Sequence, residues 1–103
     1  MSVVRINAIS VPKERSAELI ARFEARAGEV SKMPGFEEFQ LLVPTDERET
    51  VLVYTRWTTE ADFEAWLASN AFQHGHKAHN TQGPVSTHAE LWSFDVAQRE
   101  TTP

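Results

Sequence analysis

The sequence predicts an α+β fold of the ferredoxin-like type, in which an antiparallel sheet carries helices on one face. Patterns typical of strands and helices follow one another in the order β, α, β, β, α, β, which is the split βαβ arrangement. Hydrophobic residues make up 41% of the 103 residues, enough for a modest core. No repeat or linker divides the chain, so residues 1–103 are expected to form a single domain with a loose tail from about residue 98.

The first half of the chain predicts a strand, a helix and a second strand. Alternation over residues 3–11 is typical of a strand, and Pro12 bounds it. Residues 14–32 have helical spacing of apolar side chains, and this helix is expected to stop at residues 33–35. Residues 36–43 predict the second strand. In the first strand, one face carries Val3, Arg5, Asn7 and Ile9, and the other carries Val4, Ile6 and Ala8.

The second half predicts a hairpin partner, a second helix and a last strand. Residues 51–57 are rich in strand formers and should pair with residues 36–43 across a polar turn. Thr59 and Asp62 resemble a capping box at the start of the second helix. Ser69 and Asn70 can end this helix and start a short one through residues 72–79, before a last strand near residues 85–96.

The strands carry more apolar surface than two helices would readily bury. Pairing of the sheets of two subunits would cover the remainder, so a homodimer is expected. The apolar strand residues in question are Phe39, Leu41, Val51, Val53, Leu91 and Phe94.

Charge and cysteine content exclude several classes of function. The net charge of −5 disfavours a general role on nucleic acid or on anionic membrane surfaces. The absence of cysteine removes disulfides, thiolate nucleophiles, iron–sulfur ligation and thiolate haem ligation, which leaves histidine as the expected metal ligand. The sequence shows no apolar run typical of a signal peptide or a membrane span, so the expected location is the cytoplasm.

One segment pairs an indole, Trp66, with an imidazole, His76, ten residues later. A neutral histidine at the mouth of an apolar pocket can coordinate haem iron, while Trp66 and Phe72 offer bulky surfaces that would hold a porphyrin. At about 100 degrees per residue, His74 should point away from His76, whereas His79 lies about 60 degrees off and one turn along, and is the rival ligand.

Each of these residues also has a simpler interpretation. Trp66 alone is typical of a core, and an Asn in a strand, such as Asn7, is typical of an edge or a bulge. His76 alone suits a helix C-terminus, where a partial positive charge is favourable. A zinc site is a further alternative, although no cysteine and no His pair at i, i+4 supports it; its ligands would be His74, His76, His79 and His88.

Residues spread over about 2–96 match the pattern of a known family; they are Ile6, Asn7, Ala8, Arg22, Phe23, Arg26, Pro34, Gly35, Phe36, Phe39, Gln40, Trp57, Phe63 and the segment 66–76. Through these residues the chain resembles the IsdG/MhuD-type haem-degrading monooxygenases. These belong to the antibiotic-biosynthesis-monooxygenase (ABM) superfamily of dimeric α+β barrels. The resemblance implies one ABM-like domain and a dimeric α+β barrel.

The resemblance implies that Asn7, Trp66 and His76 form the catalytic site. His76 would be the axial ligand of haem iron and would leave the opposite position open for dioxygen. Asn7 would donate an amide N–H to the bound oxygen. Since an amide stays neutral, it would do so at any physiological pH. Trp66 would press on the ring and bend it, which moves electron density toward the meso carbons.

The resemblance also places the first helix along the haem pocket. Arg22 and Arg26, four residues apart, are candidate partners of the haem propionates, beside Phe23. An exposed network with Glu18, Glu24 and Glu29 explains the two arginines almost as well.

The implied reaction is oxidative opening of haem, which is both substrate and cofactor. Dioxygen is the expected co-substrate, a reductase or another external electron donor is the expected partner, and iron and a bilin-type product are released. Two alternatives use the same cavity: a cofactor-independent monooxygenase of aromatic polyketides or quinols, and a non-catalytic haem-binding protein. His76 separates the first alternative from haem chemistry, because a metal-free reaction needs no axial ligand.

Overall fold

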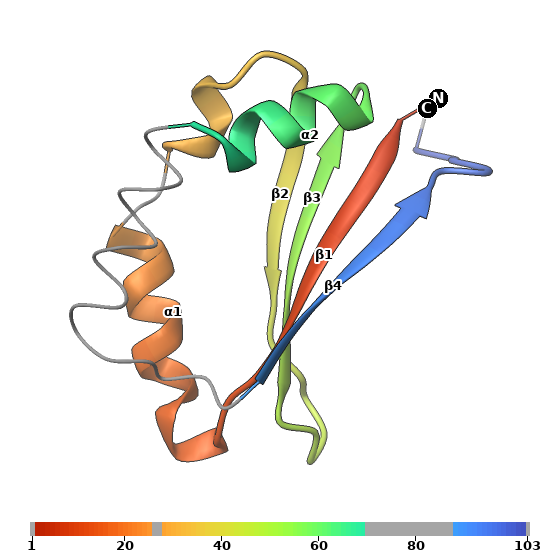
Figure 1. Ribbon diagram of the computed structural model, residues 1–103. Coiled ribbons are helices and arrows are strands. Elements are labelled where there is room, and N and C mark those ends of the chain that lie inside the picture. The colour runs from red at the N-terminus through yellow and green to blue at the C-terminus, as the bar shows by residue number, and fades with distance from the viewer. Residues whose placement is uncertain (1, 26–27, 70–87, 103) are drawn as a thin grey trace.

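The computed structural model describes residues 2–25, 28–69 and 88–102, which form one antiparallel sheet with two helices on one side of it (Figure 1). The sheet order is β2-β3-β1-β4, the order of the ferredoxin-like fold, so the predicted fold class is confirmed. The strands are β1 (Val3–Ser10), β2 (Phe36–Leu42), β3 (Thr50–Trp57) and β4 (His88–Asp95), and the helices are α1 (Ser16–Ala25) and α2 (Glu60–Leu67).

The first helix is shorter than its periodicity predicts. A turn of 3₁₀ helix at Lys13–Arg15 leads into α1, and a separate 3₁₀ turn follows at Val30–Lys32. Between them Gly28 has φ +95°, a left-handed conformation that ends an α-helix and that glycine adopts without steric cost. The predicted continuous helix over residues 14–32 is therefore wrong. Gly28 could have indicated the interruption, but the apolar spacing continues through it.

The second helix begins where the sequence predicts. Thr59 is extended, and its hydroxyl accepts a hydrogen bond from the Asp62 amide at 3.2 Å. The helix ends at Leu67, and Ser69 closes it by donating to the carbonyl of Trp66. The predicted short helix over residues 72–79 and the first residues of the predicted last strand lie outside the described part of the chain.

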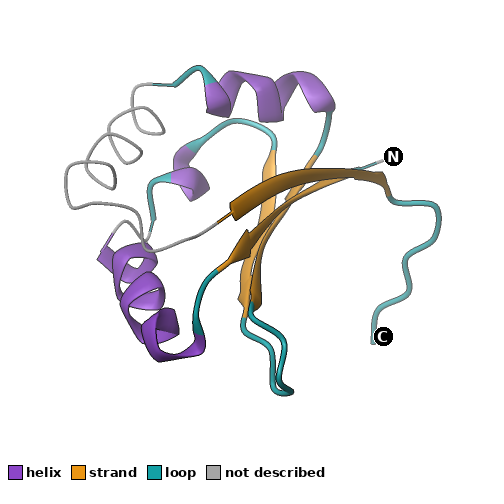
Figure 2. Cartoon of the chain, turned by 60° about the horizontal axis from the view of Figure 1, so that its bottom comes forward, coloured by secondary structure: helices purple, strands orange, loops and turns teal. Residues whose placement is uncertain are grey.

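Strand register assigns every strand residue to one of two faces. Ile9 pairs with Val51 and Asn7 pairs with Val53, so these four side chains share one face. This face carries the helices, because Ile9 and Val51 pack with Leu19 of α1. Figure 2 shows both helices on this side of the sheet. The helix side also receives Leu91, the partner of Asn7 on β4.

The core lies between α1 and the half of the sheet that is lower in Figure 1. Leu19 is 1% exposed and packs with the sheet through a cluster that we call the α1 core. Phe23, Leu41 and Val53 pack against its edge. The members of the α1 core are Ile9, Val11, Leu19 and Val51.

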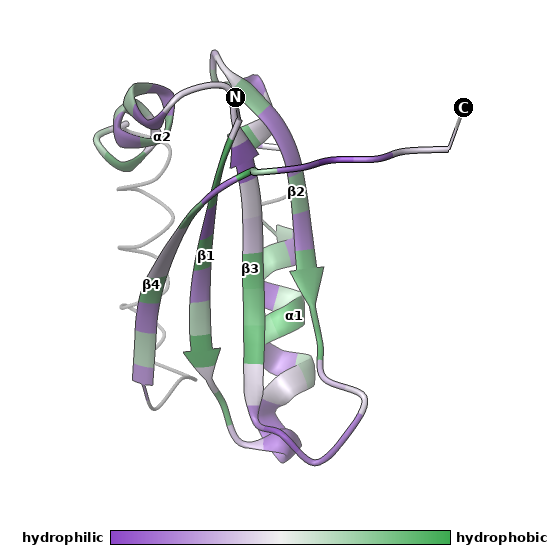
Figure 3. Ribbon diagram, turned by 90° about the vertical axis from the view of Figure 1, so that its right-hand side faces the viewer, coloured by the Kyte–Doolittle hydropathy of each residue, from purple (hydrophilic) through white to green (hydrophobic). Residues whose placement is uncertain are grey.

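The opposite side of the sheet carries no helix within the described part of the chain (Figure 3). We call it the open face. Most of the apolar strand residues predicted to need a dimer partner lie instead on the helix side, by register, and only Phe94 belongs to the open face. Alternation around the paired Val4 and Phe94 nevertheless gives the open face its own apolar residues, and those that are large and exposed are Leu42, Trp92 and Phe94.

An open groove of about 500 Å³ crosses the lower part of the open face. Its walls come from β1, β3, β4 and the loop between β2 and β3, and they include Leu52, His88 and Trp92. This groove is on the far side of the sheet from Asn7. No helix in the described part of the chain is long and apolar enough to cross a membrane.

Candidate active site

Asn7 lies in the middle of the helix side of the sheet. It is partly buried, and its neighbours across the strands are Val53 and Leu91. An amide is a poor strand former, and here it stands in an apolar wall. The side chain therefore offers a neutral hydrogen-bond donor in surroundings that otherwise suit an apolar ligand.

Two supports hold the helices on either side of Asn7. Ile9, two residues further along the strand, belongs to the α1 core. Arg5, two residues before Asn7, lies beneath α2 and is 6% exposed. At about 3.3 Å per strand residue, Ile9 and Arg5 are each roughly 7 Å from Asn7 along β1. Asn7 therefore lies between the part of the strand that contacts α1 and the part that contacts α2.

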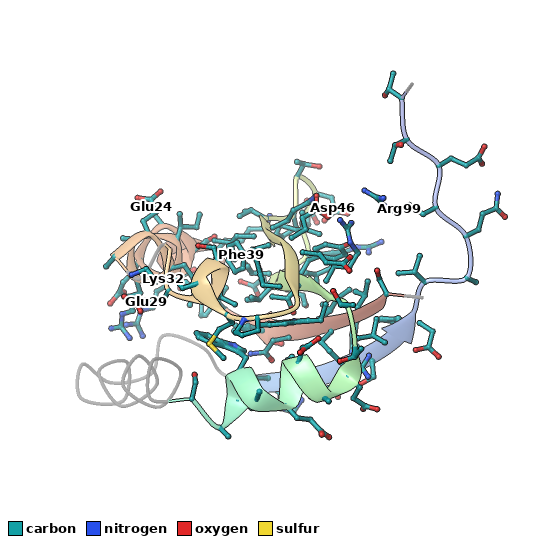
Figure 4. The ribbon with its side chains drawn as sticks, turned by 90° about the horizontal axis from the view of Figure 1, so that it is seen from above. Glu24, Glu29, Lys32, Phe39, Asp46 and Arg99 are labelled. Carbon is teal, nitrogen blue, oxygen red and sulfur yellow. The ribbon has the colours of Figure 1, made fainter. Side chains whose placement is uncertain are left out.

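Aromatic side chains of α1 and β2 meet on the same side of the sheet. The rings of Phe23 and Phe39 have centroids 6.4 Å apart and planes inclined by 37°. Phe39, labelled in Figure 4, remains 38% exposed, and Leu91 on β4 is 55% exposed although both point to the helix side. Leu91 pairs directly with Asn7, whereas Phe39 lies two strands away on the same face. Large apolar side chains left exposed on one face are typical of the wall of a ligand site.

Arg22 pairs with a carboxylate of its own helix. Its guanidinium lies 3.1 Å from Oε1 of Glu18, one turn earlier, and its side chain is only 13% exposed. Glu18 also accepts from Arg15. The helix network that competes with the propionate assignment is thus present at Arg22, and a propionate would have to share or displace Glu18.

Trp66 lies in the last turn of α2 and is partly buried. It follows Phe63 by three residues, which places both side chains on one side of the helix. Phe63 is buried against Trp57, with ring centroids 6.0 Å apart and a near edge-to-face geometry. Trp66 is therefore carried by a helix whose preceding turn is fixed to the sheet.

Three predicted site residues, Arg26, Phe72 and His76, lie outside the described residues, as do the rival histidines His74 and His79. Residues 2–25, 28–69 and 88–102 contain no group of three His, Asp or Glu side chains arranged to hold a metal ion. The zinc alternative needs three ligands from the segment that is not described. The structure thus locates Asn7, Arg22, Phe23 and Trp66 of the predicted site.

The residues present fit a haem. Phe39 and Leu91 give exposed apolar surface for a flat ring, and Asn7 gives a hydrogen-bond donor among them. Arg22 beside Phe23 gives a cation near the edge of this surface, as a ligand with carboxylate substituents requires.

Arg5 lies near the site, although its residue type and spacing predict no role for it there. Alternation along the first strand places Arg5 on the same face as Asn7. A charged residue on that face is the sequence feature that could have identified it. A buried arginine must find partners, because an unpaired buried charge is strongly unfavourable.

The fold and the apolar surface around Asn7 define the class of protein. Residues 2–78 match the family model described as antibiotic biosynthesis monooxygenase, and the chain belongs to this family. The resemblance inferred from the sequence is confirmed.

Relatives in this family have more particular names. The chain is 43% identical over 96 residues to a mycobilin-producing heme oxygenase of Mycobacterium tuberculosis, covering 93% of this chain and 90% of the relative. It is 32% identical to a heme-degrading monooxygenase of Shouchella clausii, over 91% of this chain and 89% of the relative.

Solved structures agree with these relatives. The heme-degrader MhuD from Mycobacterium tuberculosis, with two hemes bound in its active site, superposes with a TM-score of 0.80 at 40% identity, over 96% of this chain and 99% of that one. SnoaB of Streptomyces nogalater, a cofactor-independent oxygenase, reaches a TM-score of 0.77 at 26% identity, over 95% of both chains.

Proposed function

We propose that this chain is a haem-degrading monooxygenase that opens the porphyrin ring. The observation that carries the proposal is Asn7, an amide donor in an apolar and partly uncovered wall between the two helices. The names of the relatives support it, since a heme oxygenase is 43% identical over 93% of the chain.

The chain's own residues have separate tasks in this proposal. Bound haem supplies the iron at which dioxygen reacts. His76 would hold the haem through a neutral nitrogen, and Asn7 would offer its N–H to stabilise negative charge that develops on oxygen. Trp66 would pack against the ring and distort it. Each role is assigned by residue chemistry and by the resemblance, and each can be tested by substitution.

The remaining site residues bind and orient the ring. Phe23 and Phe72 supply apolar surface, and Arg22 and Arg26 pair with the propionates. Because Glu18 holds Arg22 in the structure, we expect Arg22 to contribute less to haem affinity than a free arginine would.

The reaction needs dioxygen and electrons from an external donor such as a reductase. Attack at a meso carbon would release iron and a bilin-type product. In this proposal the protein acts in the cytoplasm as a single domain and as a homodimer, and the exposed Leu42, Trp92 and Phe94 of the open face support the pairing.

The dimer has its own test. Phe94→Glu places a charge on the open face, where Phe94 is 48% exposed, and should convert a dimer to a monomer in sedimentation velocity. A wild-type chain that sediments as a monomer would exclude the dimer.

The function is tested by adding haem and then a reductant in air, while the visible spectrum is recorded. We expect a Soret band on binding, followed by bleaching and iron release. His76→Ala should abolish haem binding and His74→Ala should not, while loss of binding in His79→Ala alone would transfer the ligand role to His79.

A second candidate is supported by the similarity to SnoaB, a cofactor-independent oxygenase. That activity would place an aromatic polyketide or quinol against Asn7 and Trp66 and would need no axial histidine. A wild-type protein that gives no Soret band would favour it, whereas a stable band without bleaching would indicate a non-catalytic haem-binding protein.

A further inference from the structure

The Arg5 side chain connects the sheet to α2. Its Nη1 donates to the backbone carbonyls of Val4 at 3.0 Å and Phe94 at 3.2 Å, which belong to two adjacent strands. Its Nη2 lies 3.0 Å from Oε1 of Glu60, the first residue of α2. One guanidinium therefore holds two strands and the start of the helix at once.

The same guanidinium also lies against an aromatic ring of α2. Its central carbon is 5.8 Å from the ring centroid of Phe63, within the range of a cation–π interaction. The backbone of Arg5 is held as well, because its carbonyl accepts from the buried hydroxyl of Thr55 at 3.0 Å. The position of α2 over the sheet thus depends on a residue whose own place is fixed by β1, β3 and β4.

Trp66 shares one side of this helix with Phe63. The α2 helix has only eight residues, so a tilt or a slide at Phe63 moves Trp66 with it. Arg5 also precedes Asn7 by two residues on the same strand face. Arg5 is therefore the support that strand residue Asn7 and helix residue Trp66 have in common.

We propose that Arg5 is a positioning residue for haem degradation, acting through α2 on Trp66. This inference rests on the proposed function. It adds that the bend imposed on the ring depends on the tie between Arg5, Glu60 and Phe63, and that Arg5 itself does not touch haem.

Stability alone does not require an arginine here. The Glu60 side chain is 64% exposed, so its carboxylate stays hydrated when Arg5 is replaced, and an apolar side chain of similar volume avoids the desolvation of the guanidinium. Arg5→Met keeps an unbranched stem against Phe63 and removes every directional contact of the guanidinium. The variant should therefore fold, yet leave α2 free to shift.

The first test measures bound haem and its turnover in Arg5→Met. We expect the haem Kd to stay within about threefold of wild type, and the single-turnover degradation rate to fall about tenfold, because a displacement near 1 Å is enough for such a loss. The resonance Raman bands of out-of-plane ring modes should weaken. Arg5→Lys should restore part of the rate, since an ammonium can still pair with Glu60.

A matched pair of variants tests the tie from the helix side. Glu60→Gln removes the ion pair at a residue that is 64% exposed, so folding is not at risk. Glu64→Gln makes the same change one turn later on the same helix, at another exposed position. We expect Glu60→Gln to weaken the Raman bands and the rate, and Glu64→Gln to match wild type.

Combination with Trp66→Ala distinguishes positioning from general damage. If Arg5 acts through Trp66, Arg5→Met should change neither the Raman bands nor the rate any further in the Trp66→Ala background. An equal loss in both backgrounds, or wild-type behaviour of both Arg5→Met and Glu60→Gln, would overturn the role of Arg5 while the proposed function stands. A wild-type protein that binds no haem would overturn the proposed function first, and this role with it.

Discussion

The two helices are held to the same sheet by different kinds of contact. Helix α1 is held by apolar packing, with Leu19 buried in a cluster of aliphatic side chains from β1 and β3. Helix α2 adds a directional contact, the ion pair of Arg5 with Glu60, to the apolar ring pair of Trp57 with Phe63. Apolar burial fixes that a helix is attached, whereas hydrogen bonds and ion pairs also fix its orientation.

This difference matches what each helix carries. Helix α1 offers Phe23 and Arg22 as surface and charge, and small shifts leave both tasks possible. Helix α2 carries Trp66, whose proposed task is to press on a ring and depends on angle. The comparison predicts that α1 variants change stability most, and that α2 variants change function at a smaller cost in stability.

The largest effect is expected in the α1 core. Leu19→Ala removes a side chain that is 1% exposed and leaves a cavity, so the free energy of unfolding should fall by about 3 kcal/mol. Urea unfolding measures it. Val43→Ala, at a residue that is 42% exposed, is the matched control and should cost less than about 1 kcal/mol. Equal losses would mean that α1 is not held by apolar burial.

A second prediction concerns the close approach of α2 to Gly35, the residue just before β2. Gly35 has φ +79°, and an added Cβ would overlap the carboxylate of Asp62 in the first turn of α2. Gly35→Ala should therefore lower the free energy of unfolding by about 2 kcal/mol, from backbone strain and from the forced movement of Asp62.

Gly28 provides the control for this prediction. It has φ +95°, but an added Cβ meets nothing within 4 Å among the described residues. Gly28→Ala should incur only the backbone strain, about 1 kcal/mol. Thermal unfolding of both variants isolates the contribution of Asp62, and a larger loss at Gly28 would contradict the close approach of α2.

A smaller effect is expected at the cap of α2. Thr59→Ala removes the hydroxyl that accepts from the Asp62 amide, and the free energy of unfolding should fall by about 1 kcal/mol. Thr59→Ser keeps the oxygen and should stay near wild type in chemical denaturation. If Thr59→Ala were neutral, the cap would not contribute to the stability of the first turn of α2.

The smallest effect is expected at Glu37, which lies on the edge strand β2 and not on β1 with Arg5 and Ile9. The hydroxyl of Ser2, and after it the guanidinium of Arg56, donate to the Glu37 carboxylate and hold its pKa below the ordinary value of 4.5. A carboxyl group with a lowered pKa in the folded state stabilises the fold above its unfolded pKa, and this stabilisation is lost as the pH falls through the folded pKa.

Glu37→Gln tests this pH dependence. The variant should be less stable than wild type at pH 7 by under about 1 kcal/mol, since the group is largely exposed, and the difference should shrink below about pH 4. Urea titrations at several pH values measure it, with Glu64→Gln as the control for charge. A difference that does not change with pH would exclude the ionised carboxylate as its cause.

Much of the fold could be predicted because local patterns report it directly. Alternation gave the strands to within a residue or two wherever the chain is described, and Thr59 with Asp62 correctly placed the start of α2. The error at residues 14–32 arose because apolar spacing continues through Gly28, whose left-handed conformation interrupts the helix. Periodicity records which residues are apolar, and it does not record the backbone angle of a single glycine.

The candidate site was predictable only in its chemistry. Alternation along the first strand predicts that Asn7 shares a face with Ile9 and Arg5, and the register of β1 with β3 confirms it. The partner of Arg22 could not be chosen from the sequence, since Glu18 and a propionate suit a guanidinium equally well.

By itself, the sequence determined the order of the elements, the face on which Asn7 stands and the family to which the chain belongs. Each of these follows from residue type and spacing along one chain. The tertiary structure alone decided that Arg5 is buried beneath α2 between Glu60, Phe63 and the carbonyl of Phe94, because these partners lie 55, 58 and 89 positions away in the sequence. No local pattern reports such contacts, and they exist only once the strands have paired in register.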